Sequence, residues 1–145
     1  NDKEYVMPDV QAINTAVYRI LAGSDALSAR CAIFKGAKRP GNAANPSVTI
    51  DTKRLEPGEG DGMWIGDIVV TVYADILPNR TADHETISEI TFLITSLLGD
   101  AELELSREKA FPLIEGGSGS IEWVGAHTTE TLQESTFGLV LVDFT

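Results

Sequence analysis

The sequence predicts a single α+β domain in which two principal helices pack on one face of a mainly antiparallel sheet. Two observations lead to this fold class. Apolar residues recur at helical spacing in segments 8–22 and 83–98, and alternating or short apolar runs fill much of the remaining chain. The order is helix, strands, helix, strands, without an internal repeat or a break in composition. We therefore expect residues 1–145 to share one core.

The first predicted helix runs from Pro8 to Ala22. Proline is tolerated in the first turn of a helix because its missing N–H would have no partner there, and Asp9 suits the positive end of the helix dipole. Gly23 follows the last periodic residue and predicts the end of the helix. The apolar stripe consists of Val10, Ile13, Val17, Ile20 and Leu21, with the polar residues Gln11, Asn14 and Arg19 between its members.

The second predicted helix runs from Asp83 to Leu98. Its early turns contain the acidic Glu85 and Glu89, which favour the positive end of the dipole. Gly99 follows the last periodic residue and predicts the end of the helix. One apolar stripe, widened by Leu93, is made of Ile87, Ile90, Ile94, Leu97 and Leu98.

Six apolar or alternating segments are predicted to be strands. They are Cys31–Phe34, Ser47–Asp51, Trp64–Asp75, Ala101–Leu105, Ile121–Val124 and Ser135–Thr145. The last of these is apolar on both faces, so it is either central in the sheet or buried at a subunit contact. Trp64 and Trp123 are interpreted as core residues at strand starts, with an exposed interface anchor as the alternative.

Three segments rich in glycine, proline and charged residues are predicted to be loops. They are Lys35–Pro46, Arg54–Gly62 and Glu115–Ser120. The first contains a small basic patch of Lys35, Lys38 and Arg39, which suits contact with an acidic neighbouring subunit. At the N-terminus, Met7 is a candidate initiator, which would make residues 1–6 non-native; the alternative is that Asn1 follows a removed methionine.

The charge and cysteine content restrict the partners and the compartment. The net charge of −11 disfavours tight nucleic-acid binding, which depends on Lys and Arg neutralising phosphates. No apolar run approaches the ~20 residues of a membrane helix, so we expect no membrane partner. The single Cys31 excludes an intramolecular disulfide and favours folding in a reducing cytoplasm. We interpret Cys31 as a small buried hydrophobic residue.

The sequence predicts no metal site and no nucleophilic catalyst. His84 and His127 are far apart, and neither has a second ligand at metal-binding spacing. His84 is interpreted as part of a solvated helix start, and His127 as a surface residue in a turn. Cys31 has no local signature of a catalytic thiol, so a Cys–His pair would depend on the fold alone.

The sequence also predicts no cofactor. Gly116, Gly117 and Gly119 lack the lysine and the following amphipathic helix that a phosphate-binding loop requires, so they are interpreted as a hairpin tip. Glu102 and Glu104 lie on one face of a predicted strand. Buried, they would resemble a general acid and base, but we interpret them as a solvated strand face. We therefore expect a protein that is not an enzyme.

Several of these segments, taken in order, resemble the tail-completion or tail-terminator proteins of tailed bacteriophages. They are the N-terminal amphipathic helix, Pro46–Ile50, Trp64–Ala74 with the helix that follows it, and the alternating Phe137–Phe144. The resemblance covers nearly the whole chain. It implies a virion protein, assembled in the bacterial cytoplasm, that forms a ring, usually six-fold, on the head-proximal end of the tail tube. Such rings stop tube growth and bind head-completion or connector proteins, while DNA only passes through the lumen.

The resemblance implies no catalytic residue. From their length, polarity and glycine content, we expect two loops to reach a neighbouring subunit or the tube and to become ordered on assembly. The residues predicted for this interface are Arg54, Glu56, Glu59, Asp61 and Met63 in one segment and Glu115, Gly116, Gly117 and Gly119 in the other. The acidic loop 54–62 departs from the family pattern. The alternatives are another neck protein (a connector or a stopper), a tail-tube subunit, and a small ligand-binding or enzymatic domain.

Overall fold

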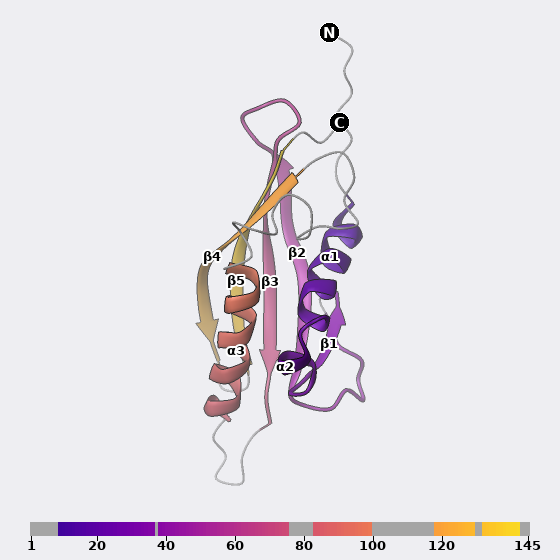
Figure 1. The fold of residues 1–145 in the computed structure, drawn as a ribbon, viewed down its shortest axis with the longest axis vertical. Helices are drawn as coiled ribbons and strands as arrows, with labels where there is room; N and C mark the ends of the chain where they lie inside the picture. The colour runs from indigo at the N-terminus through magenta and orange to yellow at the C-terminus, as the bar shows by residue number, and fades with distance from the viewer. Residues whose placement is uncertain (1–8, 37, 76–82, 100–117, 130–131, 143–145) are drawn as a thin grey trace.

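The computed structural model describes residues 9–36, 38–75, 83–99, 118–129 and 132–142 (Figure 1). Within these residues, five strands form one sheet in the order β1-β2-β3-β5-β4. The β1–β2 pair is parallel and the other three pairs are antiparallel. The elements are α1 (Val10–Ala22), α2 (Asp25–Ser28), β1 (Ala32–Lys35), β2 (Ser47–Pro57), β3 (Trp64–Tyr73), α3 (His84–Gly99), β4 (Ser118–Thr128) and β5 (Leu132–Val142).

The two long helices, α1 and α3, lie side by side on one face of the sheet (Figure 1). Helix α1 contacts β1 and β2, whereas α3 contacts β3, β4 and β5. The predicted fold class is therefore confirmed: an α+β arrangement with a mainly antiparallel sheet and two principal helices on one face.

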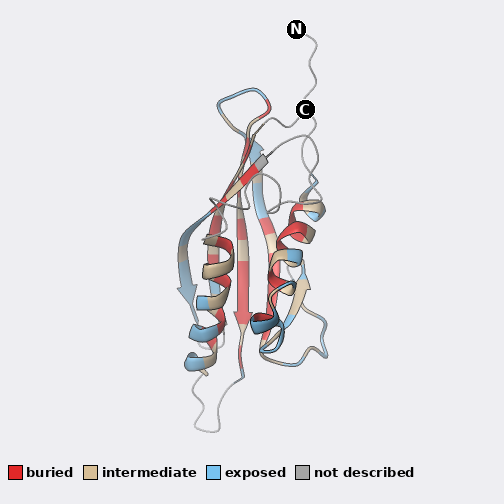
Figure 2. Cartoon of the chain, viewed as in Figure 1, coloured by how far each residue is buried: buried red, intermediate tan, exposed pale blue. Residues whose placement is uncertain are grey.

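The core lies between the helices and the sheet (Figure 2). Burial alternates along β3 and β5, which is the expected pattern when one face of a sheet packs on a core. Each fully buried aliphatic or aromatic side chain contributes about 1.5–3 kcal/mol of transfer free energy. Central members of the core include Ile13, Val17, Ile50, Ile68, Val70, Ile90, Ile94, Phe137 and Leu139.

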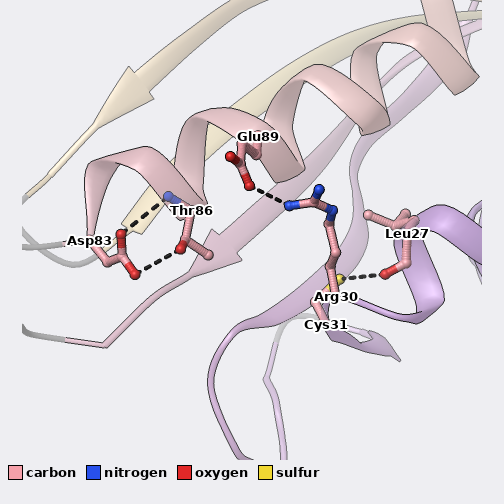
Figure 3. A network of polar contacts seen from close by, with 6 residues as sticks. All are labelled: Leu27, Arg30, Cys31, Asp83, Thr86 and Glu89. Carbon is pink, nitrogen blue, oxygen red and sulfur yellow. Dashed lines mark hydrogen bonds and ion pairs between the residues drawn. The ribbon is translucent and has the colours of Figure 1, made fainter.

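Both long helices begin at acidic caps. The Asp9 carboxylate accepts a hydrogen bond of 2.9 Å from the backbone N–H of Gln11. The Asp83 carboxylate accepts one from the Thr86 N–H at 3.2 Å and one from the Thr86 hydroxyl at 2.7 Å (Figure 3). These bonds satisfy donors that the first helical turn leaves without intrahelical partners. Asp83 is thus the cap of α3, and Pro8 lies outside the described residues.

The short helix α2 was not predicted, because Gly23-Ser24-Asp25 indicates only a helix end. Instead, Ser24 begins a new turn, and its hydroxyl accepts a hydrogen bond from the Leu27 N–H at 3.3 Å. Leu27 is fully buried. The next residues connect this turn to α3, since Arg30 forms an ion pair with Glu89 (Figure 3).

Several strand limits differ from the prediction. Strand β2 continues to Pro57 and β4 begins at Ser118, so residues 54–57 and 118–120 form strands where loops were expected. Pairing with β3 and β5 outweighs the local preference of glycine, proline and acidic residues. Strand β5 lies between β3 and β4, which agrees with the interior position expected for a strand apolar on both faces. The predicted strand Ala101–Leu105 lies outside the described residues.

The two tryptophans differ in burial. Trp64 is 9% exposed and belongs to the core, as predicted, whereas Trp123 is 47% exposed. The prediction of a core position for Trp123 is therefore wrong. Trp123 lies on β4, the outermost strand of the described sheet, where no further strand covers its outer side.

Candidate interface at the hairpin end of the sheet

The hairpin of β2 and β3 extends beyond the two long helices, and its loop lies at one end of the described part of the chain (Figure 1). The strands are paired from Ser47↔Tyr73 at one end to Pro57↔Trp64 at the other. Only residues 58–63 are therefore loop, where the sequence predicted a loop over Arg54–Gly62. Regular strand pairing positions the first part of this predicted interface before any partner binds.

A β-bulge lies at the base of the hairpin. The pairing shifts between Thr52 and Arg54, so that one extra residue is inserted into β2. The Thr52 N–H and hydroxyl both donate to the Asn14 side-chain oxygen, at 2.9 and 2.8 Å. Asn14 is fully buried. Helix α1 thus supplies the acceptor for a backbone donor that the bulge removes from the strand ladder.

Glycine is required on the strand opposite this bulge. A Cβ atom at Gly66 would lie 2.2 Å from the Arg54 carbonyl oxygen, well inside van der Waals contact. Strands β2 and β3 therefore approach each other closely here, which any side chain at Gly66 would prevent.

A charged cluster follows the bulge on the sheet face opposite the helices. Arg54 Nε donates to Asp67 at 2.8 Å, and Arg54 Nη1 lies 2.5 Å from Glu56. The hydrogen bond and charge of Asp67, with the charge of Glu56, raise the pKa of Arg54. The guanidinium is exposed to solvent, so the cluster orients these side chains and adds little stability.

The hairpin loop is closed by its own backbone hydrogen bonds. The Gly58 N–H donates to the Met63 carbonyl at 2.7 Å, and the Met63 N–H donates to the Gly60 carbonyl at 3.1 Å. Gly62 has a φ of 74°, a left-handed conformation that glycine adopts without steric cost. The acidic Glu59 and Asp61 are exposed at the tip, beside a shallow hollow of about 390 Å³ bounded by residues 57–64.

A second hollow, of about 380 Å³, lies beside the charged cluster. Strand register places Asp67 opposite Gly138, and Gly138 opposite Glu122. Gly138 has no side chain to fill this hollow, and Val124 lines one side of it. Arg54 neutralises Asp67, so this hollow contains no buried carboxylate pair of the kind that acid–base catalysis needs.

The structure brings part of the predicted interface together. Arg54 and Glu56 contact each other on β2, while Glu59, Asp61 and Met63 lie in the adjoining loop. Gly119 lies on β4 opposite Leu141, which is itself opposite Trp64 at the base of the hairpin. Gly119, the described interface residue of the second segment, therefore lies at the same end of the sheet as the hairpin. Glu115, Gly116 and Gly117 lie outside the described residues.

The candidate catalytic residues do not form a site within the described residues. Cys31 Sγ donates to the Leu27 carbonyl at 3.5 Å, and partial burial raises the pKa of its thiol to about 11 (Figure 3). A thiol with this pKa is protonated at neutral pH and is a poor nucleophile. Cys31 was predicted to be a buried hydrophobic residue, and in the structure its side chain is only half-buried.

The histidines and carboxylates are also separated. His84 begins α3 and is exposed, as predicted, but His127 lies in β4 opposite Glu134 and not in a turn. No group of three or more potential metal ligands occurs among the described residues. Glu102 and Glu104 lie outside those residues.

Two members of the predicted basic patch make contacts within the chain. The Arg39 guanidinium lies 4.3 Å from the centre of the Tyr73 ring and donates to Ser47 Oγ at 2.9 Å. Lys35 Nζ lies 5.5 Å from the centre of the Tyr18 ring. The Arg39 contacts hold the connection between β1 and β2 against the sheet. Lys35 instead contacts α1, where its Nζ also donates to Thr15 Oγ1 at 3.4 Å, and Lys38 is exposed.

Sequence reasoning missed Asn14, and for Trp123 it favoured a core position over the exposed interface anchor that it held as the alternative. Asn14 lies four residues after Val10 and three before Val17, which is the spacing of the apolar stripe itself, although the sequence analysis treats it as a polar residue between stripe positions. An alternating strand with Trp123 among glutamate, glycine and histidine gave a weak signal of an exposed edge.

Comparisons with known proteins address the fold. No helix in the described part of the chain is long and apolar enough to cross a membrane. No protein-family model matches the sequence, and a search of curated proteins finds no match. Among solved structures, the chain is similar to one in the virion of a native gene transfer agent particle. The TM-score is 0.63 at 17% sequence identity, over 89% of this chain and 92% of that chain. The likeness shows that the two chains share a fold.

Proposed function

We propose that this chain is a structural protein of a phage-like virion and has no catalytic role. The observation that carries the proposal is the shared fold with a chain of a gene transfer agent virion, since the match extends over nearly the full length of both chains.

Within that class, we propose a tail terminator: a ring, six-fold in the family that the sequence resembles, on the head-proximal end of the tail tube. The ring would stop tube growth and present its other side to a head-completion or connector protein. The hairpin end of the sheet suits tube or subunit contact, because Glu59 and Asp61 project there on a loop closed by its own hydrogen bonds. A rigid projecting loop loses little conformational entropy on binding.

The acidic balance supports a lumen through which DNA passes without binding. With 22 acidic against 11 basic residues, the chain has few groups that can neutralise phosphates. We therefore propose that the lumen of the ring is net negative. A ring whose channel is lined by Lys and Arg would contradict this part of the proposal.

The test combines native mass spectrometry of the purified protein with electron microscopy of tail tubes from the same particle. We expect discrete rings at one end of each tube and an arrest of tube elongation when the protein is added. Binding to the head connector without binding to tubes would favour a connector or stopper instead. A monomer that binds neither would contradict the proposal.

A hairpin variant tests which end of the sheet makes the contact. The double variant Glu59→Lys, Asp61→Lys reverses both charges at the loop tip, and we expect it to weaken tube capping while leaving the fold intact. The matched control is the double variant Glu85→Lys, Glu134→Lys, which changes the net charge equally. Both positions are exposed and lie away from the hairpin, in the first turn of α3 and on β5 opposite Thr71 (Figure 1). Equal loss of capping in both variants would assign the effect to net charge and not to the hairpin.

A further inference from the structure

Strand β4 forms a long exposed edge of the described sheet. It spans eleven residues and pairs with β5 on one side only. Edge strands are usually protected from association by lysine or proline. Ser118–Thr128 contains neither, and its positions from Glu122 to Val124 and from Ala126 to Thr128 are exposed. This edge therefore lacks two common features that keep an edge free of partners.

A bulge in β4 sets how this edge can bind. The register shifts between Trp123 and Gly125, which inserts Val124 as an extra residue. Trp123 is 47% exposed and Val124 is 63% exposed. A bulge interrupts strand addition, so a partner would bind through the exposed side chains and not through a continuous hydrogen-bond ladder. Tryptophan is among the residues most enriched at energetically important interface positions.

The two sides of the sheet differ in charge. Elements α3, β4 and β5 contain no Lys or Arg and carry the acidic residues Glu85, Glu89, Glu122 and Glu134. The described residues from α1 to the start of β2 carry one acidic residue, Asp25, and the basic residues Arg19, Arg30, Lys35, Lys38 and Arg39. Because β1 and β4 are opposite edges of the sheet, a basic side and an acidic side face away from each other.

Some of these basic groups are available to a partner. Arg30 pairs with Glu89, and Arg39 is held against Tyr73 within the chain. Lys35 and Lys38 are exposed near the β1 edge, and Lys35 lies over the ring of Tyr18. An aromatic ring and two lysines there complement an edge strand that presents Trp123 on the helix side of the sheet and Glu122 on the opposite side.

We propose that the β4 edge of one copy, through Trp123 and Glu122, binds the side of the next copy formed by Tyr18, Lys35 and Lys38. This inference rests on the proposed ring and names the contact that closes it. Repetition of one head-to-tail contact produces a closed ring when its rotation divides the circle. A symmetric β4-to-β4 contact would instead place the Glu122 side chains of two copies in the same contact, which like charges disfavour.

A charge exchange tests the contact. The single variants Glu122→Lys and Lys38→Glu each place like charges across every subunit contact, whereas the double variant restores opposite charges with their positions exchanged. We expect each single variant to weaken each contact about fivefold, and the double variant to recover most of the loss. Sedimentation of the free protein and its retention on tail tubes measure the effect. The matched control is Glu85→Lys, an exposed reversal of the same sign and size as Glu122→Lys in the first turn of α3 and outside the proposed surface, which we expect to change neither.

Replacement of the aromatic anchor gives a second measurement. Trp123→Ala should weaken each contact by tenfold or more, in line with an interface hot spot. Thermal unfolding and circular dichroism confirm that the variant is folded. A folded Trp123→Ala protein that associates as the parent does would overturn the inference.

The outcomes separate the contact from the function. A protein that caps tubes while both single charge variants associate normally, or while Glu122→Lys strengthens association, overturns the proposed contact and leaves the terminator proposal standing. A protein that forms rings through this contact but never binds tubes leaves the contact standing and contradicts the terminator proposal. A protein that neither self-associates nor binds tubes contradicts both.

Discussion

The sheet contains two bulges, and they differ in what covers them. The bulge in β2 is enclosed, since Asn14 from α1 accepts both hydrogen bonds of Thr52 and the backbone of Arg54 lies close to Gly66. The bulge in β4 is open, with Trp123 and Val124 exposed and no atom within 4 Å of a Cβ added at Gly125. One irregularity is part of the core, and the other belongs to the surface.

This difference separates stability from association. An enclosed bulge requires particular residues around it, because an unpaired buried donor costs about 1–3 kcal/mol. An open bulge has solvent as an alternative partner, so its residues are free to be chosen for binding. Substitutions near β2 should therefore act on folding, and substitutions near β4 on association.

The largest expected effect comes from a matched pair of glycines. Gly66→Ala should destabilise the protein by about 3 kcal/mol, because the new methyl group would collide with the Arg54 backbone, which cannot rotate away. Gly125→Ala should change stability by less than about 0.5 kcal/mol, since the methyl group enters open space. Urea unfolding of both variants measures the contrast. Equal stability of the two variants would show that the bulges do not differ as described.

A smaller loss is expected for Asn14→Ala. The change removes two hydrogen bonds and leaves the Thr52 N–H and hydroxyl without their acceptor, which we expect to cost about 2 kcal/mol. The matched control is Thr15→Ala, the adjacent helical position, whose hydroxyl donates to the Gln11 carbonyl and accepts from Lys35 Nζ, both at the surface. Denaturant unfolding compares the two, and a loss for Thr15→Ala as large as that for Asn14→Ala would contradict the role assigned to the enclosed bulge.

The sequence predicts the two helices and the core well, because their apolar residues follow the helical repeat and pack on a single face. The stripe of Ile87, Ile90, Ile94 and Leu98 is buried in the structure as predicted. Helix ends are also predicted closely, since Asp83 and Gly23 carry local capping signals. These features depend on residues near each other in the chain.

The bulges and the strand extensions could not be predicted in the same way, since they depend on contacts between distant residues. Arg54 and Glu56 are polar and lie close to Pro57 and Gly58, which favours a loop, yet pairing with β3 makes them a strand. Asn14 is polar and is therefore expected to face solvent on a helix. It is buried because its side-chain oxygen accepts hydrogen bonds from Thr52, which is distant in the sequence. For the predicted interface, the sequence placed Gly119 in a loop tip, whereas pairing with Leu141 puts it in the sheet.

The smallest expected effect concerns the half of the sheet that contains the enclosed bulge. There, the alkylation rate of the Cys31 thiol measures how readily the structure opens locally. Its folded pKa of about 11 lies above the ordinary 9.0, so at pH 8 the native thiolate fraction is about one hundredth of the unfolded one. Alkylation by iodoacetamide should be slower in the native protein by a similar factor and should rise about tenfold per pH unit until pH 11. A native rate within threefold of the urea-unfolded rate would contradict this.

The raised pKa of Cys31 also makes the stability of the protein depend on pH, and the reactivity of Cys31 allows the two bulges to be compared. Because the folded pKa is raised, the stabilisation from the neutral thiol is present below pH 9 and is lost as pH rises through 11. Asn14→Ala should accelerate alkylation of Cys31 at pH 8, since weakening the β2 side makes local opening more frequent. Gly125→Ala should leave the rate unchanged, because the open bulge lies at the other edge of the sheet. If both variants accelerate alkylation equally, the two halves of the sheet open together, and the separation of stability from association does not hold.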